Sequence, residues 1–413
     1  MARGRTPAVD PDGAAATLDA QLETVTVTGT GTATAVSLTG QLTGGELGRW
    51  CAATLTGTTR LADDVTAAAA NLHPIRPSRV EDPQHWATVG GALGQRLAFA
   101  THHAPPYYAL LGTHRAGLAD WATLGRCATR FPTHTGLDPT RAGRANQLRP
   151  LPDGRWLDLD TEPGDHSTAR ATTGTRTGLV VDLTERLVAY LGAHAPPGHL
   201  ANTHGAEAVL ARVCVVLTDW ETAYRTGQLP THLNPLYANP DTTVPDLLAA
   251  VPTHQVAELV ELTARAHQSG MLTRLTHPAT TPTPTTTAHP TPPGISGPVF
   301  IEHWADGDLL IPAATGDGTV LLDVKTVTSV RDPERVGRWL WQLLSYTWLD
   351  PGDRYRIRDV GLYLARHATL ITWPLNQFAA TLLDDRNIND AATAFRRLAN
   401  RVITAETGQP ARR

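Results

Sequence analysis

The chain has 413 residues and a formal net charge of −4 at pH 7. This length suffices for two modest domains or one domain with large insertions, so neither a metal nor disulfides are needed to stabilise a small core. The charge excludes a globally basic protein that wraps nucleic acid, although a local basic groove would not show in the total.

The cysteines and the apolar segments bear on location. Cys51, Cys127 and Cys214 are odd in number, far apart and form no C-x-x-C motif, which is typical of reduced thiols in a cytoplasmic protein. The first residues lack the apolar segment of a signal peptide, and no run of about 18 apolar residues occurs. We therefore expect a cytoplasmic protein without a membrane segment.

The first 72 residues are predicted to form a variable N-terminal region. Alternating Val and Thr in "ETVTVTGTGTATAVSLTGQL" (23–42) favours weak strands or an adaptable edge. Over 46–72 the spacing of apolar residues predicts helix, which Pro74 and Pro77 end.

Residues 73–276 are predicted to be mainly helical. Helical periodicity occurs at 86–101, 177–194, 205–227 and within 244–270. A Thr/Pro-rich linker follows at 277–296, because proline breaks the helical hydrogen-bond ladder and this composition favours extended chain.

The pattern changes over 297–380. Three short apolar strands are predicted, then a helix at 334–349, then two more strands in "DVGLYLARHATLITWPL". This order predicts an α/β fold in which a mixed sheet is flanked by helices. Residues 381–413 are predicted to form a C-terminal helix and tail.

The third of these strands contains the only lysine of the chain, Lys325, in "LLDVKTV"; the other 34 basic residues are arginine. Strand alternation places Asp323 and Lys325 on one face. A turn through the Asp317–Gly318 hairpin signal brings Asp308, on the preceding strand, beside Asp323. Two carboxylates form an oxygen site for Mg²⁺. A lysine there can orient or deprotonate a metal-polarised water, whereas arginine stays protonated.

An ordinary surface Asp–Lys pair is the alternative reading, and D-x-K alone is a weak signal. The ordered set is more specific, because the following helix carries Gln342 and Tyr346 four residues apart on one face. Near the start of this helix Arg331, Arg335 and Arg338 recur at helical spacing. They fit contacts to phosphate oxygens or, equally well, a solvated basic face.

With these residues in place, segment 297–378 resembles the PD-(D/E)XK nuclease superfamily, and especially its RecB-like branch, whose core helix carries Q-x-x-x-Y. The resemblance covers about a fifth of the chain. It implies a C-terminal restriction-endonuclease-like core and a mainly helical N-terminal region that caps or interrupts it, with 86–101 as a candidate first core helix.

The resemblance also implies roles for the site residues. Asp308 and Asp323 would bind Mg²⁺, for which Mn²⁺ can substitute, Lys325 would serve the attacking water, and Gln342 and Tyr346 would support the site or touch DNA. The implied activity is hydrolysis of DNA in repair or in defence against foreign DNA, and the residues do not distinguish DNA from RNA. No P-loop motif is present, so a coupled helicase or ATPase would be a separate partner.

The chain departs from this family pattern in two respects. RecB-like members often carry an upstream G-x-x-x-His helix, and "VGGALGQRLAF" has Gly90 as the glycine but Gly94 where the histidine would fall. Members with an iron–sulfur cluster carry four cysteines around the core, so we expect no cluster here.

Two other functions therefore stay open: a catalytically weak or inactive nuclease fold that binds nucleic acid, and a Mg²⁺ phosphoesterase for small molecules, which a closed pocket would favour. Asp306 and Glu302 are candidates for supporting acids or simple turn residues. Glu207 and Glu221 are expected to face solvent from the long middle helix. The 17 histidines include no zinc-ligand spacing.

Overall fold

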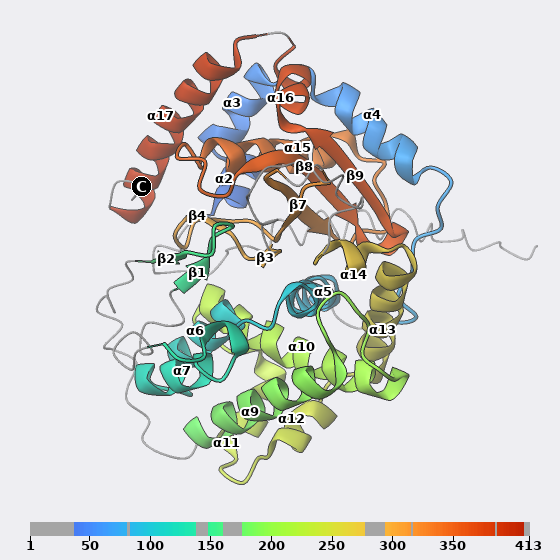
Figure 1. Cartoon of the computed structure of the whole chain (residues 1–413), viewed down its shortest axis with the longest axis vertical. Helices are drawn as coiled ribbons and strands as arrows, with labels where there is room; N and C mark the ends of the chain where they lie inside the picture. Colours follow the sequence, from blue (N-terminus) through green and yellow to red (C-terminus); the bar gives the residue numbers. More distant parts are fainter. Residues whose placement is uncertain are drawn as a thin grey trace, which may run out of the picture.

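The computed structural model describes residues 37–80, 83–137, 148–159, 176–276, 294–314, 317–384 and 386–408. Figure 1 shows a mixed sheet with one group of helices on one side and a larger group, from the middle of the chain, on the other. None of the helices in these ranges is long and apolar enough to cross a membrane.

The sheet has five strands in the order β3-β6-β7-β8-β9. Their bounds are β3 (Ile295–Ser296), β6 (Leu309–Pro312), β7 (Thr319–Lys325), β8 (Ile357–Leu364) and β9 (Thr369–Pro374). Only β7 and β8 are parallel, and helix α15 (Pro333–Trp348) connects them. In the β6–β7 hairpin Leu309 lies opposite Leu322. Asp308, one residue earlier, therefore reaches the level of Asp323.

The two faces of the sheet belong to two different hydrophobic cores. Leu309, Val320 and Leu322 pack into the core of the middle helices. Leu310 and Leu321 pack into the other core, with α15 and the terminal helices. Because β7 is covered on both faces, its sequence is apolar almost throughout. Asp323 and Lys325 follow Leu321 in the strand alternation, so they face α15.

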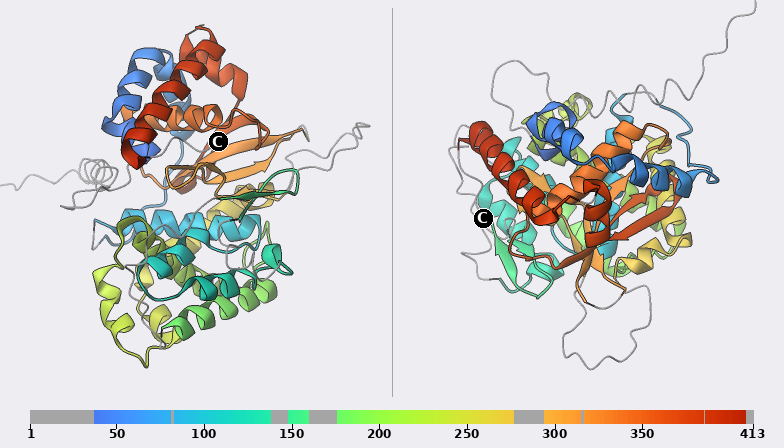
Figure 2. Two further views of the ribbon diagram at one scale, coloured as in Figure 1. Left: turned by 90° about the vertical axis from the view of Figure 1, so that its left-hand side faces the viewer. Right: turned by 90° about the horizontal axis from the view of Figure 1, so that it is seen from above.

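The helices fall into the same two groups. The group on the α15 side consists of α2 (Leu38–Gly44), α3 (Glu46–Thr54), α4 (Thr58–Ala69), α15, α16 (Leu375–Leu383) and α17 (Ile388–Thr407). The middle group consists of α5 (His85–Thr101), α6 (Tyr107–Arg115), α7 (Trp121–Ala128), α9 (Thr177–His194), α10 (His204–Thr226), α11 (Asn234–Ala238), α12 (Val244–Ala249), α13 (Thr253–Gln268) and α14 (Met271–Arg274). Two small two-stranded sheets pair β1 (Leu148–Pro150) with β2 (Trp156–Asp158) and β4 (Val299–Ile301) with β5 (Ala305–Asp306). The described elements also include the short 3-10 helices η1 (Pro132–His134), η4 (Thr231–Leu233) and η5 (Ala365–His367). Helix α5 runs along the boundary between the two groups (Figure 2).

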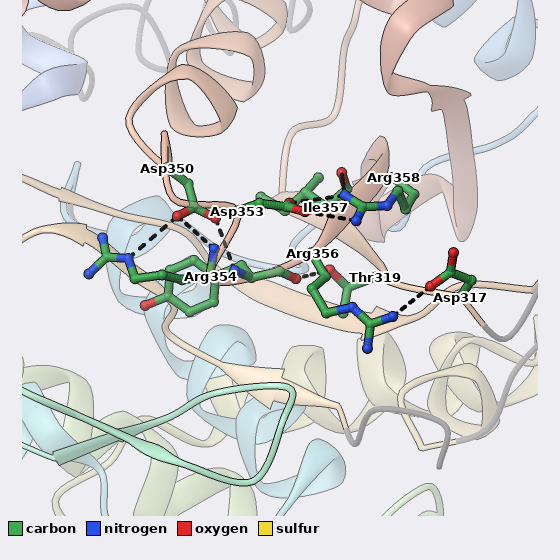
Figure 3. A network of polar contacts seen from close by, with 9 residues as sticks. Asp317, Thr319, Asp350, Asp353, Arg354, Arg356, Ile357 and Arg358 are labelled. Atoms are coloured by element: carbon green, nitrogen blue, oxygen red, sulfur yellow. Dashed lines mark hydrogen bonds and ion pairs between the residues drawn. The ribbon is translucent and has the colours of Figure 1, made fainter. Parts of the chain in front are cut away.

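The connection from α15 to β8 is fixed by polar contacts (Figure 3). The Asp350 carboxylate accepts hydrogen bonds from the backbone N–H groups of Arg354 and Tyr355, at 3.0 and 2.9 Å. The Thr319 N–H donates to the Arg356 carbonyl at 2.9 Å, and its hydroxyl donates to the Tyr355 carbonyl at 2.7 Å. These bonds hold the start of β8 against the start of β7, and with it the register that presents Asp323 and Lys325.

The mixed α/β sheet predicted for the C-terminal part is confirmed. The helices predicted at 86–101 and 334–349 correspond to α5 and α15, and the one at 46–72 is divided into α3 and α4 by a turn at 55–57.

Two predicted segments are wrong in part. Residues 38–44 form helix α2 and not a strand, because the Ser37 hydroxyl caps the helix by accepting from the Gly40 N–H at 3.2 Å. Residues 23–36 lie outside the described ranges. The predicted linker extends too far, since Ile295 and Ser296 form β3, and its part at 277–293 is not among the described residues.

The N-terminal region also contributes to the sheet domain. Its described helices share a hydrophobic core with α15, and the Trp341 indole N–H donates to the Thr58 hydroxyl at 2.8 Å. These helices thus form part of the layer that supports α15.

Candidate functional site

The end of β7 presents a buried ion pair. Asp323 is 3% exposed, and the Lys325 Nζ lies 2.7 Å from its Oδ2. That oxygen has this ionic neighbour but no aligned hydrogen-bond donor. Burying a carboxylate requires a compensating partner. Because the Lys325 ammonium is not aligned for a hydrogen bond to this oxygen, it offsets only part of the cost of burying the Asp323 carboxylate.

Asp308 adds a second carboxylate beside this pair. Its Oδ2 accepts a hydrogen bond of 2.6 Å from the Val324 N–H, which fixes it at the edge of β7. The residue is exposed, but it faces the cavity, whose walls are protein. This desolvation and the negative charge of Asp323 raise the pKa of Asp308 to about 7, against the opposing effects of Lys325 and the Val324 N–H. Asp308 also forms a side-chain hydrogen bond with Asp323, so near neutral pH the two acids share a proton that partly relieves their repulsion.

Gln342 and Tyr346 complete the cluster from α15, which covers the face of the sheet that carries Asp323 and Lys325. The Lys325 ammonium donates to the Gln342 Oε1 at 3.3 Å. The Gln342 Nε2 donates to the Tyr346 hydroxyl at 2.7 Å and to the Thr39 hydroxyl at 3.2 Å. Burial and the nearby carboxylates raise the pKa of Tyr346 well above its usual value, so its hydroxyl stays protonated. Gln342 therefore orients Lys325 and is itself held on two sides.

The three arginines near the start of α15 do not line the cavity. Arg331 is exposed and Arg338 is half-buried. Arg335 is 6% exposed, with its guanidinium carbon 5.3 Å from the centre of the Trp339 ring. The alternative prediction of a solvated basic face is therefore wrong for Arg335, because this residue is buried. Lys325 lies 5.5 Å from the same ring, so Trp339 is a neighbour of both cations.

A cavity of about 520 Å³ lies between the ends of β6 and β7 and the middle helices. Asp308, Asp323, Lys325, Gln342 and Tyr346 all line it. Helix α5 forms part of the opposite wall, and Gly94, where the family pattern has histidine, faces the cavity with no atom within 4 Å of the position of a Cβ. The wall also includes residues that the sequence patterns did not indicate: Tyr107, Tyr108, Arg149 and Arg225.

Two acids on α10 were predicted to face solvent, but both have partners within the protein. Glu207 is 4% exposed, and the Arg96 Nε lies 2.6 Å from its Oε1. Glu221 lines the cavity, and its Oε2 accepts from the Gln95 Nε2 at 2.9 Å. The prediction was wrong because both partners lie on α5, more than 100 residues away in the chain. Of the other two acids, Asp306 lines the cavity, and Glu302 lies 3.1 Å from the His303 ring.

The carboxylate pair is a suitable donor set for a hard divalent cation. Within the described residues no three His, Cys, Asp or Glu side chains converge as a metal site. Mg²⁺ nevertheless binds with one or two carboxylates, its other ligands being water and substrate phosphate. The buried Asp323 oxygen without an aligned donor and the raised pKa of Asp308 are both features that a bound cation would relieve.

Comparisons with family models, with curated proteins and with solved structures give no match for this chain. The function is therefore argued from the side chains of the site.

Proposed function

We propose that this protein is a Mg²⁺-dependent nuclease that hydrolyses DNA phosphodiester bonds, on a restriction-endonuclease-like core. The observation that carries the proposal is the meeting of Asp308, Asp323 and Lys325 at the cavity, on two adjacent strands. Bound Mg²⁺ would neutralise the scissile phosphate and polarise the attacking water. We place this activity in the cytoplasm, without an iron–sulfur cluster, with any helicase or ATPase on another chain.

The residues of the chain have distinct roles in this proposal. Asp308 and Asp323 hold the cation, and the Val324 N–H fixes the Asp308 carboxylate. Lys325 lies beside the carboxylates, where its ammonium can orient the attacking water or, after losing a proton, accept one from that water. Gln342 holds the ammonium there by accepting its hydrogen bond, and the Tyr346 hydroxyl holds the Gln342 amide by accepting from its Nε2. Arg331 and Arg338 are proposed to contact phosphates outside the cavity, whereas Arg335 is buried against Trp339 and is no longer a candidate.

Cleavage assays test the proposal. Plasmid and single-stranded DNA should be cut with Mg²⁺ or Mn²⁺ and left intact with EDTA. Asp323→Asn and Asp308→Asn should each lower the rate by about 10²-fold or more, because each removes a charge from the cation site. Asp182→Asn is the matched control, because Asp182 is an exposed acid on α9. DNA binding without Mg²⁺-dependent cleavage by the folded protein would contradict the proposal and support an inactive binding module.

The size of the cavity favours a second candidate, a Mg²⁺ phosphoesterase for small molecules. Its volume of about 520 Å³ lies within the roughly 300–1,000 Å³ of small-ligand sites. The same five residues would carry the reaction. Hydrolysis of bis(p-nitrophenyl) phosphate with no cleavage of any oligonucleotide would select this candidate over the nuclease.

A further inference from the structure

The wall of the cavity opposite the carboxylates carries aromatic rings and guanidinium groups. Tyr107 and Tyr108 begin α6, Arg149 lies on β1, and Arg225 lies in the last turn of α10. The Arg149 guanidinium carbon is 3.5 Å from the centre of the Tyr107 ring and 5.3 Å from that of Tyr108. Arg149 is 1% exposed, so it supports the tyrosine rings, and the exposed Arg225 is the guanidinium that can reach a ligand.

Tyr108 is at the centre of this group. Its ring stacks with that of Tyr224, with centroids 4.9 Å apart and planes at 27°. The Arg225 guanidinium carbon is 5.7 Å from the Tyr108 ring. Tyr108 and Tyr224 are both half-buried. Tyr108 lines the cavity, whereas Tyr224 is not a lining residue and supports the Tyr108 ring by stacking on it. We call Tyr108, Tyr224, Arg149 and Arg225 the aromatic–arginine wall.

Rings and guanidinium groups together match the two parts of a nucleotide. Any of the nucleobases can stack on a tyrosine ring, and arginine contacts phosphate oxygens. A base within a duplex is already stacked and cannot reach such a ring. The cavity of about 520 Å³ has the size of a small-ligand site. A single nucleotide is of that size, whereas a duplex is much larger, since its major groove alone is about 12 Å wide.

We infer that the aromatic–arginine wall binds one unpaired nucleotide next to the scissile phosphate, so that the substrate is single-stranded nucleic acid. This inference rests on the proposed function, since it names the form of the substrate that reaches the carboxylate pair. Glu221 opposes phosphate binding, because it pairs with Arg225 at 2.5 Å. It also accepts from Gln95, so it keeps a partner when Arg225 turns to a phosphate.

Binding measured in EDTA tests the base contact separately from cleavage. The probes are a fluorescein-labelled oligodeoxythymidylate, an abasic strand of the same length and a blunt duplex, followed by fluorescence anisotropy. Tyr108→Ala should weaken binding of the oligodeoxythymidylate about tenfold and leave the abasic strand unaffected. Tyr108→Phe should keep the affinity, because it keeps the ring. Tyr190→Ala, a half-buried tyrosine change on α9, is the control.

Arg225→Ala tests the phosphate contact. It should weaken both the oligodeoxythymidylate and the abasic strand, and lower the salt dependence of binding. Arg186→Ala is matched to it, because Arg186 also forms an exposed i,i+4 pair with an acid, and it should have little effect.

Three outcomes would overturn the inference: unchanged binding of oligodeoxythymidylate by Tyr108→Ala, an equal loss for the duplex, or an equal loss in Arg186→Ala. If the wild type fails to cleave DNA but keeps the ring-dependent binding, the proposed function fails and the nucleotide site stands. If it cleaves DNA and the Tyr108→Ala protein binds normally, the nucleotide site fails and the proposed function stands.

Discussion

Two groups of charges lie close together in this protein, one buried and one open to the cavity, and they are balanced differently. The first, the Glu258 cluster, consists of Glu258 on α13, Arg366 in the 3-10 helix η5 that follows β8, and His85 on α5, each at most 5% exposed. The Arg366 Nη2 donates to the Glu258 Oε1, and the His85 Nε2 lies 2.8 Å from the other carboxylate oxygen. Burial alone would raise the pKa of Glu258, but His85 and Arg366 outweigh it, and the pKa is lowered.

The second, the carboxylate cluster, consists of Asp308, Asp323 and Lys325. Here two acids share one ammonium, and burial together with the charge of Asp323 raises the pKa of Asp308 to about 7. The carboxyl group of the first cluster is satisfied by the fold itself, whereas this cluster keeps an excess of negative charge next to a cavity. Such an imbalance is typical of functional sites, because a ligand supplies the missing charge.

The two clusters are mechanically connected. The Arg366 Nε donates to the carbonyl oxygen of Thr326 at 2.7 Å, directly after Lys325 in the chain, and its Nη1 donates to the Ile75 carbonyl at 3.0 Å. The balanced cluster therefore holds the end of β7, on which the unbalanced cluster is built.

Arg366→Ala should have the largest effect on stability. It leaves the buried Glu258 carboxylate without its arginine partner, which costs about 3–5 kcal/mol in the free energy of unfolding. Urea denaturation measures this loss. Arg358→Ala is the control, because it breaks an exposed pair with Asp353 and should cost less than about 1 kcal/mol. Equal losses in the two variants would show that the Glu258 cluster is no stronger than a surface ion pair.

Lys325→Arg and Lys325→Ala should affect the reaction instead of the fold. If the residue only balanced Asp323, arginine would retain most of the activity, since its charge is the same. We expect both variants to lose about 10²-fold or more in cleavage rate. Alanine has no amine, and a guanidinium, whose pKa is above about 12, stays protonated and has a different shape. Single-turnover cleavage rates measure this loss.

Removing Lys325 leaves Asp323 without its ammonium, so the stability of each variant has to be compared with that of the wild type by urea denaturation. Cleavage at the wild-type rate by a folded Lys325→Ala protein would refute the role assigned to the only lysine of the chain.

The carboxylate cluster could be predicted from sequence because its parts are local. Alternation within β7 places Asp323 and Lys325 on one face, a hairpin turn brings β6 alongside, and the four-residue spacing puts Gln342 and Tyr346 on one side of α15. Each step involves neighbours within about 40 residues of sequence.

The other side of the cavity could not be predicted this way. Tyr108, Arg149 and Glu221 come from separate elements that meet only through the packing of the middle helices, and no periodicity records such contacts. The same holds for Glu258 and Arg366, 108 residues apart. Helix α2 was missed for a different reason, since a capping serine outweighed the Thr-rich composition that favoured a strand.

The pH dependence of stability should distinguish the two clusters by its sign, with a smaller effect than either substitution above. The folded pKa of Asp308 is raised from 3.8 to about 7, so between these values the native state binds more protons than the unfolded state, and stability falls as the pH rises. The folded pKa of Glu258 is lowered, so its contribution is present above the unfolded value of about 4.3 and is lost as the pH falls below it. Urea denaturation in EDTA across this range should show that Asp308→Asn removes the loss toward neutral pH, whereas Glu258→Gln removes the loss toward acid. Parallel pH profiles for the two variants would contradict the idea that one cluster is balanced by the fold and the other awaits a cation.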